Sequence, residues 1–237
     1  MPKRGDRYGN KSFSELQQAN RSPIAGYEDQ KIMPLENAVE KIVPFVKDVV
    51  QYANTAKEKC NRISDLLTWD ESAAIYLYTM PINFYSRLNQ TLRAKNRHAL
   101  KPWFAFLKLF MSALNKLPSS KTTVWRAVTN DIGTLPGDNK ETIWWGINST
   151  SMALNVVQAF LSEPWTLFAI DTIHGKNIAE YSAFPCEQEV ILMPGTHVRV
   201  KSKSLNCIGS FSIVHWEEKL EVEQDPKRLV CERFSEV

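Results

Sequence analysis

The sequence changes character at Pro118-Ser119-Ser120, and this change limits the possible folds more than any other feature. Before it, apolar residues recur every three or four positions, as on the buried face of a helix. After it, short segments that alternate or are rich in β-branched and aromatic residues predict strands. We therefore expect a helical half over residues 35–118 and a β-rich half over residues 122–222. No internal repeat is visible, and the two halves are expected to pack as one domain over residues 31–222.

Helix boundaries in the first half follow from caps and prolines. Pro44 interrupts the apolar pattern between Leu35 and Ala53 and should kink or split that segment. Thr68 and Glu71 have the spacing of a capping box, with Thr at the N-cap and Glu at N3. Helices are expected over residues 70–79, 83–96 and 100–117, the last with Pro102 in its first turn. The apolar side of the last helix is better explained by a packed core than by a ligand pocket.

The second half is expected to consist of short strands joined by turns. The strands are predicted over residues 122–128, 141–147, 165–171, 189–192, 197–202 and 211–216. A turn-rich loop is predicted over residues 131–139, a helix over 152–161 and a bend at His174-Gly175. One ring of Trp144-Trp145 should enter the core, and the other should line a cleft.

Charge, cysteine spacing and hydropathy exclude several classes of protein. The chain has 29 Lys and Arg against 26 Asp and Glu without a basic block, which argues against nucleic acid as the main partner. Its 4 cysteines are not spaced like metal ligands, so we expect reduced thiols and no metal. The polar arm over residues 1–30 has no apolar signal core, and the run Trp103–Leu114 is too short to span a bilayer. The expectation is a cytoplasmic protein with a charged tail over residues 223–237 and no membrane partner.

Two acids stand where a loop enters a strand, in the segment AEYSAFPCEQEVILM. Glu189 opens the strand that Pro194-Gly195 stops, and Glu187 precedes it by two residues. Side chains at i and i+2 of an extended chain share a face, so the acids should lie together. Two carboxylates that lie so close repel each other, which costs free energy unless a bound cation or a reaction involves them. The competing interpretation, and the commoner one for exposed pairs, is a solvated strand end.

Two polar features precede these acids in the β-rich half. Arg126 lies inside the apolar strand segment TTVWRAV, where its charge needs an anion: either a protein carboxylate or a bound phosphate. Ser149-Thr150-Ser151 lies between a strand and a helix. These hydroxyls can cap the helix, hold a nucleotide, or do both.

The order of these features resembles the arginine-specific mono-ADP-ribosyltransferase family. The motifs are Arg126 in VWRAV, the Ser149-Thr150-Ser151 triplet, and Glu187-Gln188-Glu189 in YSAFPCEQEVILMPG. The segments AAIYLYTM and LKPWFAFLKLF are similar too, and the likeness runs from about Gly26 to Glu217, closest to intracellular invertebrate members. It implies an α+β fold, with two small, roughly perpendicular sheets forming an NAD cleft and an N-terminal helical lobe. It also implies transfer of ADP-ribose from NAD, as substrate, to arginine in a protein partner.

The resemblance assigns roles to individual residues. Arg126 would hold the NAD phosphates and ribose, and Ser149 would bind NAD and orient the catalytic acid. Glu189 would be that acid, and Glu187 would select and activate the acceptor arginine. Phe184 would face the protein substrate, and Tyr78 and Ser182 would be further NAD contacts. One departure is Ala127, where the family often has glycine next to the nicotinamide.

Two other functions remain open at this point. An NAD glycohydrolase would use water in place of arginine. A catalytically idle module would bind NAD or a protein through the helical lobe. The presence of Glu187 favours transfer over hydrolysis, and Arg126, Ser149 and Glu189 argue against an idle module. Neither the protein target nor the oligomeric state follows from the sequence.

Overall fold

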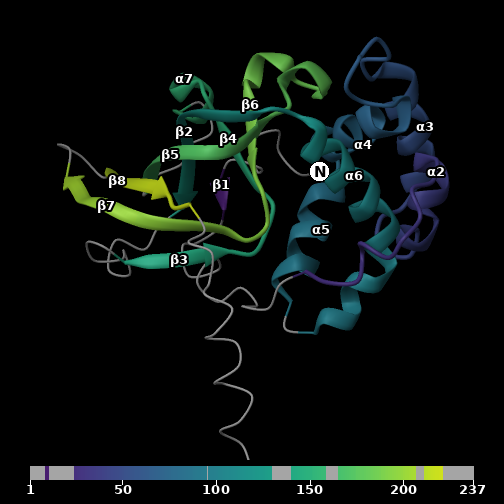
Figure 1. The fold of residues 1–237 in the computed structure, drawn as a ribbon, viewed down its shortest axis with the longest axis horizontal. Coiled ribbons are helices and arrows are strands. Elements are labelled where there is room, and N and C mark those ends of the chain that lie inside the picture. The colour runs from purple at the N-terminus through teal and green to yellow at the C-terminus, as the bar shows by residue number, and fades with distance from the viewer. Residues whose placement is uncertain are drawn as a thin grey trace, which may run out of the picture.

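The protein consists of a group of helices beside a group of strands (Figure 1). This computed structural model describes residues 9–10, 24–94, 96–129, 140–158, 165–206 and 211–220. The expected loop at residues 131–139, the tail at 223–237 and most of the arm at 1–30 lie outside these residues. The helices are α2 Leu35–Ala38, α3 Val49–Lys59, α4 Trp69–Thr79, α5 Phe84–Arg93, α6 Phe104–Lys116 and α7 Leu154–Gln158. The 3-10 turns are η1 Glu40–Ile42, η2 Arg97–Trp103, η4 Ala179–Tyr181 and η5 Pro185–Glu187.

The predicted helix signals are confirmed with one exception. Pro44 lies in the break between η1 and α3, so the first apolar segment is split. Thr68 and Glu71 form a complete capping box at the start of α4. The helix expected over 100–117 begins later than predicted, because residues 97–103 form the 3-10 helix η2. Pro102 lies near the end of η2, immediately before the α-helix begins.

The apolar side of α6 is part of the core, as predicted. Trp103, Phe106 and Phe110 have no exposed surface. The rings of Phe84 and Phe106 lie edge to face with centroids 4.7 Å apart, and Phe106 stacks on Phe110 at 5.5 Å. This aromatic cluster fixes α5 and α6 against α4 and so gives the helical half a rigid centre.

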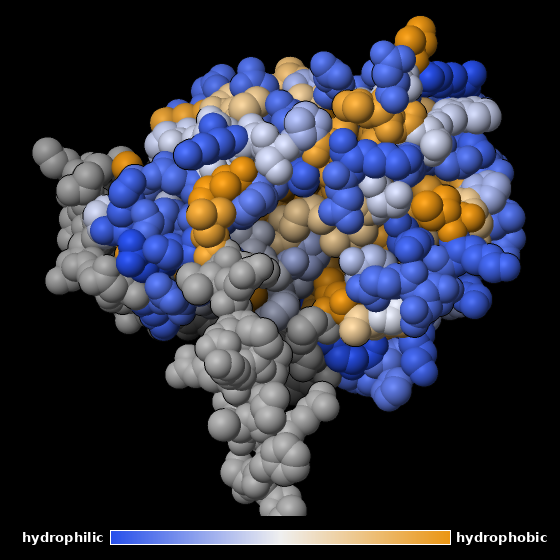
Figure 2. Space-filling model, viewed as in Figure 1, coloured by the Kyte–Doolittle hydropathy of each residue, from blue (hydrophilic) through white to orange (hydrophobic). Residues whose placement is uncertain are grey.

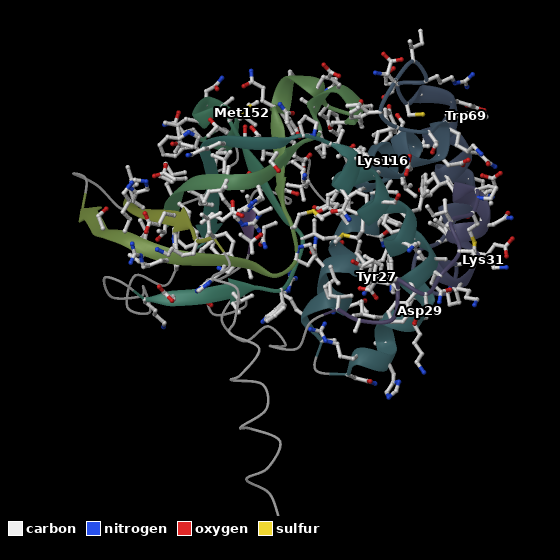
Figure 3. All side chains as sticks on the ribbon, viewed as in Figure 1. Tyr27, Asp29, Lys31, Trp69, Lys116 and Met152 are labelled. Carbon is white, nitrogen blue, oxygen red and sulfur yellow. The ribbon has the colours of Figure 1, made fainter. Side chains whose placement is uncertain are left out.

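A buried carboxylate connects α4 to α6. Glu71 is 1% exposed, and its side chain accepts hydrogen bonds from the Thr68 backbone at 2.9 Å and from Ser112 Oγ at 2.9 Å. Lys116, labelled in Figure 3, donates to the same carboxylate at 2.7 Å. Burial raises the pKa of Glu71, but these hydrogen bonds outweigh it and hold the pKa below its usual value.

We expect Glu71→Gln to lower the free energy of unfolding by about 1 kcal/mol at pH 7, since Gln keeps the capping box and loses the charge. The folded pKa of Glu71 is lowered, so its contribution is present above the unfolded pKa and is lost as pH falls through the folded pKa. Urea unfolding of both proteins at pH 7 and at successively lower pH should therefore show a converging difference. Glu58→Gln, at an exposed α3 position, is the control and should change little. A difference that stays constant with pH would contradict the charge-based explanation.

Eight strands form one hydrogen-bonded network within the described residues. They are β1 Gly9–Asn10, β2 Ser119–Thr129, β3 Glu141–Trp144, β4 Asn148–Ser151, β5 Trp165–Asn177, β6 Glu189–Leu192, β7 Thr196–Asn206 and β8 Phe211–Glu218. The long strands β2 and β5 pair antiparallel, and β5 pairs parallel with β8. The short strands β4 and β6 pair with each other; β4 also pairs with β2 at Trp125, and β6 pairs with the end of β5 at Lys176 and Asn177. The predicted α+β class is confirmed. The strands expected in two small sheets are joined by hydrogen bonds into one network, with an additional pairing between β2 and β5.

Three local predictions in the β-rich half are wrong. The strand expected over 141–147 ends at Trp144, and Ser149-Thr150-Ser151 is itself part of strand β4 rather than a helix cap. The bend expected at His174-Gly175 lies within β5. There the Glu218 carboxylate accepts hydrogen bonds from the backbone N–H groups of Ile173 and His174, which satisfies the backbone close to where the pairing with β2 shifts register. Gly175 is required at this place, because a Cβ would lie 2.8 Å from Val190 Cγ1 on β6.

The two neighbouring tryptophans separate, and the prediction that one of them enters the core is confirmed. Trp144 is 2% exposed and packs with Phe168 and Trp216 in the core of the sheet. Trp145 lines a cavity of about 100 Å³ between the two halves of the protein. The other residues around this cavity are Ile24, Tyr27, Leu107, Met111 and Pro194.

Candidate active site

The two acids of the loop-to-strand junction are buried. Glu187 is 1% exposed and Glu189 has no exposed surface. The interpretation as a solvated strand end is therefore wrong. Burying two carboxylates costs free energy that folding alone does not require, so their position indicates a use other than solubility.

The backbone between the two acids differs from the expected one. Glu187 ends the 3-10 turn η5, and Gln188 has a left-handed backbone with φ of 47°. The chain is therefore not extended between Glu187 and Glu189, and the argument from alternating side chains fails. A positive φ is uncommon outside glycine and costs about 1 kcal/mol or more, so the surrounding structure must hold it.

Strand β4 supplies that support. Ser151 pairs with Glu189 across the two strands, and the Ser151 hydroxyl donates to the Glu187 carbonyl at 2.7 Å. The backbone N–H of Met152 donates to the Gln188 carbonyl at 3.1 Å. The third residue of the triplet thus fixes the backbone of the acidic turn rather than capping a helix.

Arg126 lies on β2, beside the first residue of the triplet. Its guanidinium is buried, the residue being 2% exposed, and Nη1 donates to the Ser149 carbonyl. Burial lowers the pKa of Arg126 to about 10. Electrostatic repulsion from Arg93 lowers this pKa further, while the electrostatic interactions with Tyr78 and Glu189 raise it. A buried guanidinium close to an acid and to a second arginine is suited to hold an anion.

Tyr78 reaches this group from the helical half. Its hydroxyl lies 3.2 Å from Ser149 Oγ and accepts a hydrogen bond from Asn89 Nδ2 at 3.4 Å. The Tyr78 ring packs against Phe110 with centroids 4.9 Å apart. The aromatic core of the helices therefore positions a hydroxyl directly against the β-rich half.

The loop before the acids is also held by α4. Thr79 Oγ1 accepts a hydrogen bond from Ala183 N at 2.8 Å. Ser182 is buried, and its hydroxyl accepts from Phe184 N at 3.0 Å. Phe184 is half-buried and Cys186 is exposed. The structure thus gives Ser182 a local contact within this loop.

Ala127 points away from Arg126. It packs with Val157 and Leu167 on the opposite face of β2, as alternation along a strand requires. The methyl group that replaces the expected glycine hydrogen is therefore directed at α7 and not at the face that carries Arg126.

Sequence reasoning missed three residues of this arrangement. Asn89 and Arg93 both lie on α5, and Thr79 follows Tyr78 at the end of α4. Their residue types are common on helices, and only the packing of the helical half on the β-rich half brings them to the site. Within the described residues, no group of three or more His, Cys, Asp or Glu side chains could hold a metal. Among these same residues, no helix is long and apolar enough to cross a membrane.

One comparison with known proteins matches most of the chain. The model of the NAD:arginine ADP-ribosyltransferase family matches residues 40–218. No protein with a curated description matches the sequence.

Three solved structures with the same fold are bacterial proteins. The Vis toxin of Vibrio splendidus, in complex with agmatine, is 20% identical with a TM-score of 0.56, covering 84% of this chain and 93% of that one. The type III effector XopAI from Xanthomonas axonopodis pv. citri is 17% identical with a TM-score of 0.59, covering 91% and 92%. Exoenzyme S from Pseudomonas aeruginosa, with human 14-3-3 protein beta and carba-NAD, is 16% identical with a TM-score of 0.55, covering 86% and 98%. At these identities the likeness establishes the fold.

Proposed function

Because the chain belongs to the NAD:arginine ADP-ribosyltransferase family, we propose that it transfers ADP-ribose from NAD to arginine side chains of proteins and releases nicotinamide. The observation that supports the proposal is that Arg126 on β2 donates to Ser149 on β4, that β4 pairs with β6 beside Glu189, and that both acids are buried. Under this proposal residues 31–222 work as one catalytic domain, since Tyr78 of the helical half contacts Ser149 of the β-rich half.

Arg126 is the residue proposed to bind the NAD diphosphate. Burial lowers the pKa of Arg126 to about 10, which reflects the cost of burying its charge, and an accompanying anion would offset that cost. A diphosphate would supply that charge, and a guanidinium can donate to two of its oxygens at once. Ser149, with its hydroxyl 3.2 Å from the Tyr78 hydroxyl, is proposed to contact the adjoining ribose.

Glu189 is proposed to act on the bond that breaks. Cleavage between nicotinamide and ribose builds positive charge on the ribose, as in glycoside hydrolysis. A fixed carboxylate that hydrogen bonds to the ribose 2′-hydroxyl stabilises this charge more than it stabilises bound NAD. Glu189 is suited to this because it is fully buried and paired with Ser151 across two strands.

Glu187 is proposed to select and activate arginine. The pKa of a free arginine is above about 12, so the acceptor arrives protonated and its nitrogen is a poor nucleophile. Glu187 would orient the guanidinium and take its proton as the new carbon–nitrogen bond to the ribose forms. Burial of Glu187 strengthens its attraction for a cation. The Vis structure contains agmatine, a small guanidine, which supports the choice of acceptor.

The proposal is tested with labelled NAD and agmatine on the wild-type protein. Agmatine is expected to stimulate nicotinamide release by about tenfold or more and to form an ADP-ribose adduct that mass spectrometry detects. An equal rate of nicotinamide release with and without agmatine, and no adduct, would identify an NAD glycohydrolase instead. Absence of release, with or without agmatine, would overturn the enzymatic assignment and leave an NAD-binding or interaction module.

A further inference from the structure

The loop that joins α3 to α4 exposes apolar side chains. We refer to residues 61–67 as the outer loop. Within it Ile63 is 92% exposed and Leu66 is 51% exposed, and Trp69, at the start of α4, is 45% exposed. Single exposed apolar residues are common, but three within seven positions are a concentration that binding surfaces display. In Figure 2 an apolar side chain projects beyond the hydrophilic surface at the upper right, where Figure 1 shows this loop.

The outer loop has a defined conformation. Asn61 follows the buried Cys60, and its carbonyl accepts a hydrogen bond from Ser72 Oγ at 2.6 Å. Ser64 Oγ accepts hydrogen bonds from the backbone N–H groups of Leu66 and of the next residue, at 3.2 and 3.1 Å. These hydrogen bonds fold the loop into a turn, and the turn defines where its apolar side chains lie on the surface.

Ser64 also attaches the outer loop to the loop that carries the acids. Its hydroxyl lies 2.9 Å from the hydroxyl of Tyr181. Because both lone pairs of Ser64 Oγ are engaged by backbone N–H groups, its hydrogen is the one donated to Tyr181. Tyr181 is 6% exposed, and Phe184 and Glu187 follow it within six residues. The turn η4, which ends at Tyr181, lies against η5, which ends at Glu187. The outer loop is therefore attached to the segment that carries the residue proposed to hold the acceptor.

The ring of Trp69 is fixed in place by its neighbours. The ammonium of Lys57 lies 4.6 Å from the ring centroid and the guanidinium of Arg62 lies 4.8 Å from it. The indole N–H donates to the Lys57 carbonyl at 2.8 Å. Figure 3 shows Trp69 at the outer edge of the helical half. A rigid, partly exposed aromatic ring loses little entropy on contact, which makes it an efficient binding residue.

We propose that the outer loop and Trp69 form a docking surface for the protein acceptor, which contacts them through an apolar patch next to its target arginine. This inference rests on the proposed function, which assigns Glu187 to the acceptor guanidinium. The occupant is a protein rather than a free guanidine. A small guanidine can reach Glu187 without touching Ile63 or Leu66, whereas a folded protein that inserts an arginine must cover the surface around it.

The test compares a protein acceptor with a small one in the same enzyme. The variant is Ile63→Ser with Leu66→Ser, and the matched control is Ile32→Ser with Val43→Ser, at positions 56% and 47% exposed near α2 and η1. Transfer from biotin-labelled NAD is measured to the proteins of a soluble cell extract, against a blank without enzyme, and separately to agmatine. The docking variant should transfer about tenfold less label to protein than the wild type and the control do. Its kcat/KM for agmatine should stay within about twofold of the wild-type value, which also shows that the variant is folded.

Each alternative outcome has a distinct meaning. Equal protein labelling by the docking variant and the wild type would overturn the docking surface. A parallel loss with agmatine and with protein would also overturn it, since the loop would then act on the site itself. A wild type that modifies agmatine but no protein would refute the protein acceptor and leave the chemistry of the proposed function intact. A wild type that releases no nicotinamide would instead refute the proposed function, and with it the basis for this inference.

Discussion

Replacing Glu189 with Gln is expected to lower the rate of nicotinamide release at saturating NAD by about 100- to 1,000-fold. The amide keeps the size of the side chain but removes the negative charge that is proposed to stabilise the developing cation on the ribose. Since Glu189 has no exposed surface, water cannot replace that charge. The measurement is nicotinamide release with NAD well above its KM, together with the dissociation constant of NAD, which should change much less.

Glu180→Gln is a matched control for this variant. Glu180 is an exposed residue of η4 in the same segment, so its substitution should leave the rate of nicotinamide release unchanged. The thermal unfolding temperature of the Glu189 variant should equal or exceed that of the wild type, because the substitution removes a buried charge. Nicotinamide release within about threefold of the wild type would show that Glu189 is not the residue that stabilises the transition state.

Replacing Glu187 with Gln is expected to abolish transfer while NAD cleavage remains. The adduct with agmatine should form about 100-fold more slowly, the loss expected when a general base is removed. Nicotinamide release in the absence of agmatine should fall by no more than a few fold, because Glu189 is unchanged. The informative quantity is therefore the ratio of adduct formed to nicotinamide released.

Two results would contradict this role of Glu187. Full transfer to agmatine by the variant would mean that another group takes the proton from the guanidinium. Equal loss of transfer and of NAD cleavage would mean that Glu187 acts on NAD itself. A thermal unfolding temperature close to that of the wild type would exclude misfolding as the cause in either case. This temperature is expected because the amide retains the volume of the Glu187 side chain at a position that is 1% exposed.

The sequence was sufficient to predict the elements with local signals. The capping box at Thr68 and the break at Pro44 depend on residues within one helical turn, and both are found in the structure. The aromatic side of α6 follows from helical periodicity, and its burial follows from the hydrophobic effect. The strand that begins at Glu189 was expected from its apolar run and its stop at Pro194-Gly195.

The features that sequence could not provide depend on distant parts of the chain. Nothing near Gln188 signals a left-handed residue, because its conformation is maintained by hydrogen bonds from β4 to the turn. Ser149-Thr150-Ser151 has weak strand propensity and is a strand because it pairs with β6. Asn89 has no local pattern that distinguishes it from a surface residue, and its place beside Tyr78 arises from helix packing.

The last turn of α4 contacts residues that are synthesised much later than the helix itself. Its Tyr78 contacts Ser149 across 71 positions of sequence, and its Thr79 contacts Ala183 across 104. Closing loops of this length costs entropy before any contact compensates for it, so these bonds form late in folding. A nascent chain or a proteolytic fragment that ends before β6 contains the helical half without Glu189. Under the proposed function, transferase activity would therefore require a chain that extends past Glu189 and whose two halves have docked.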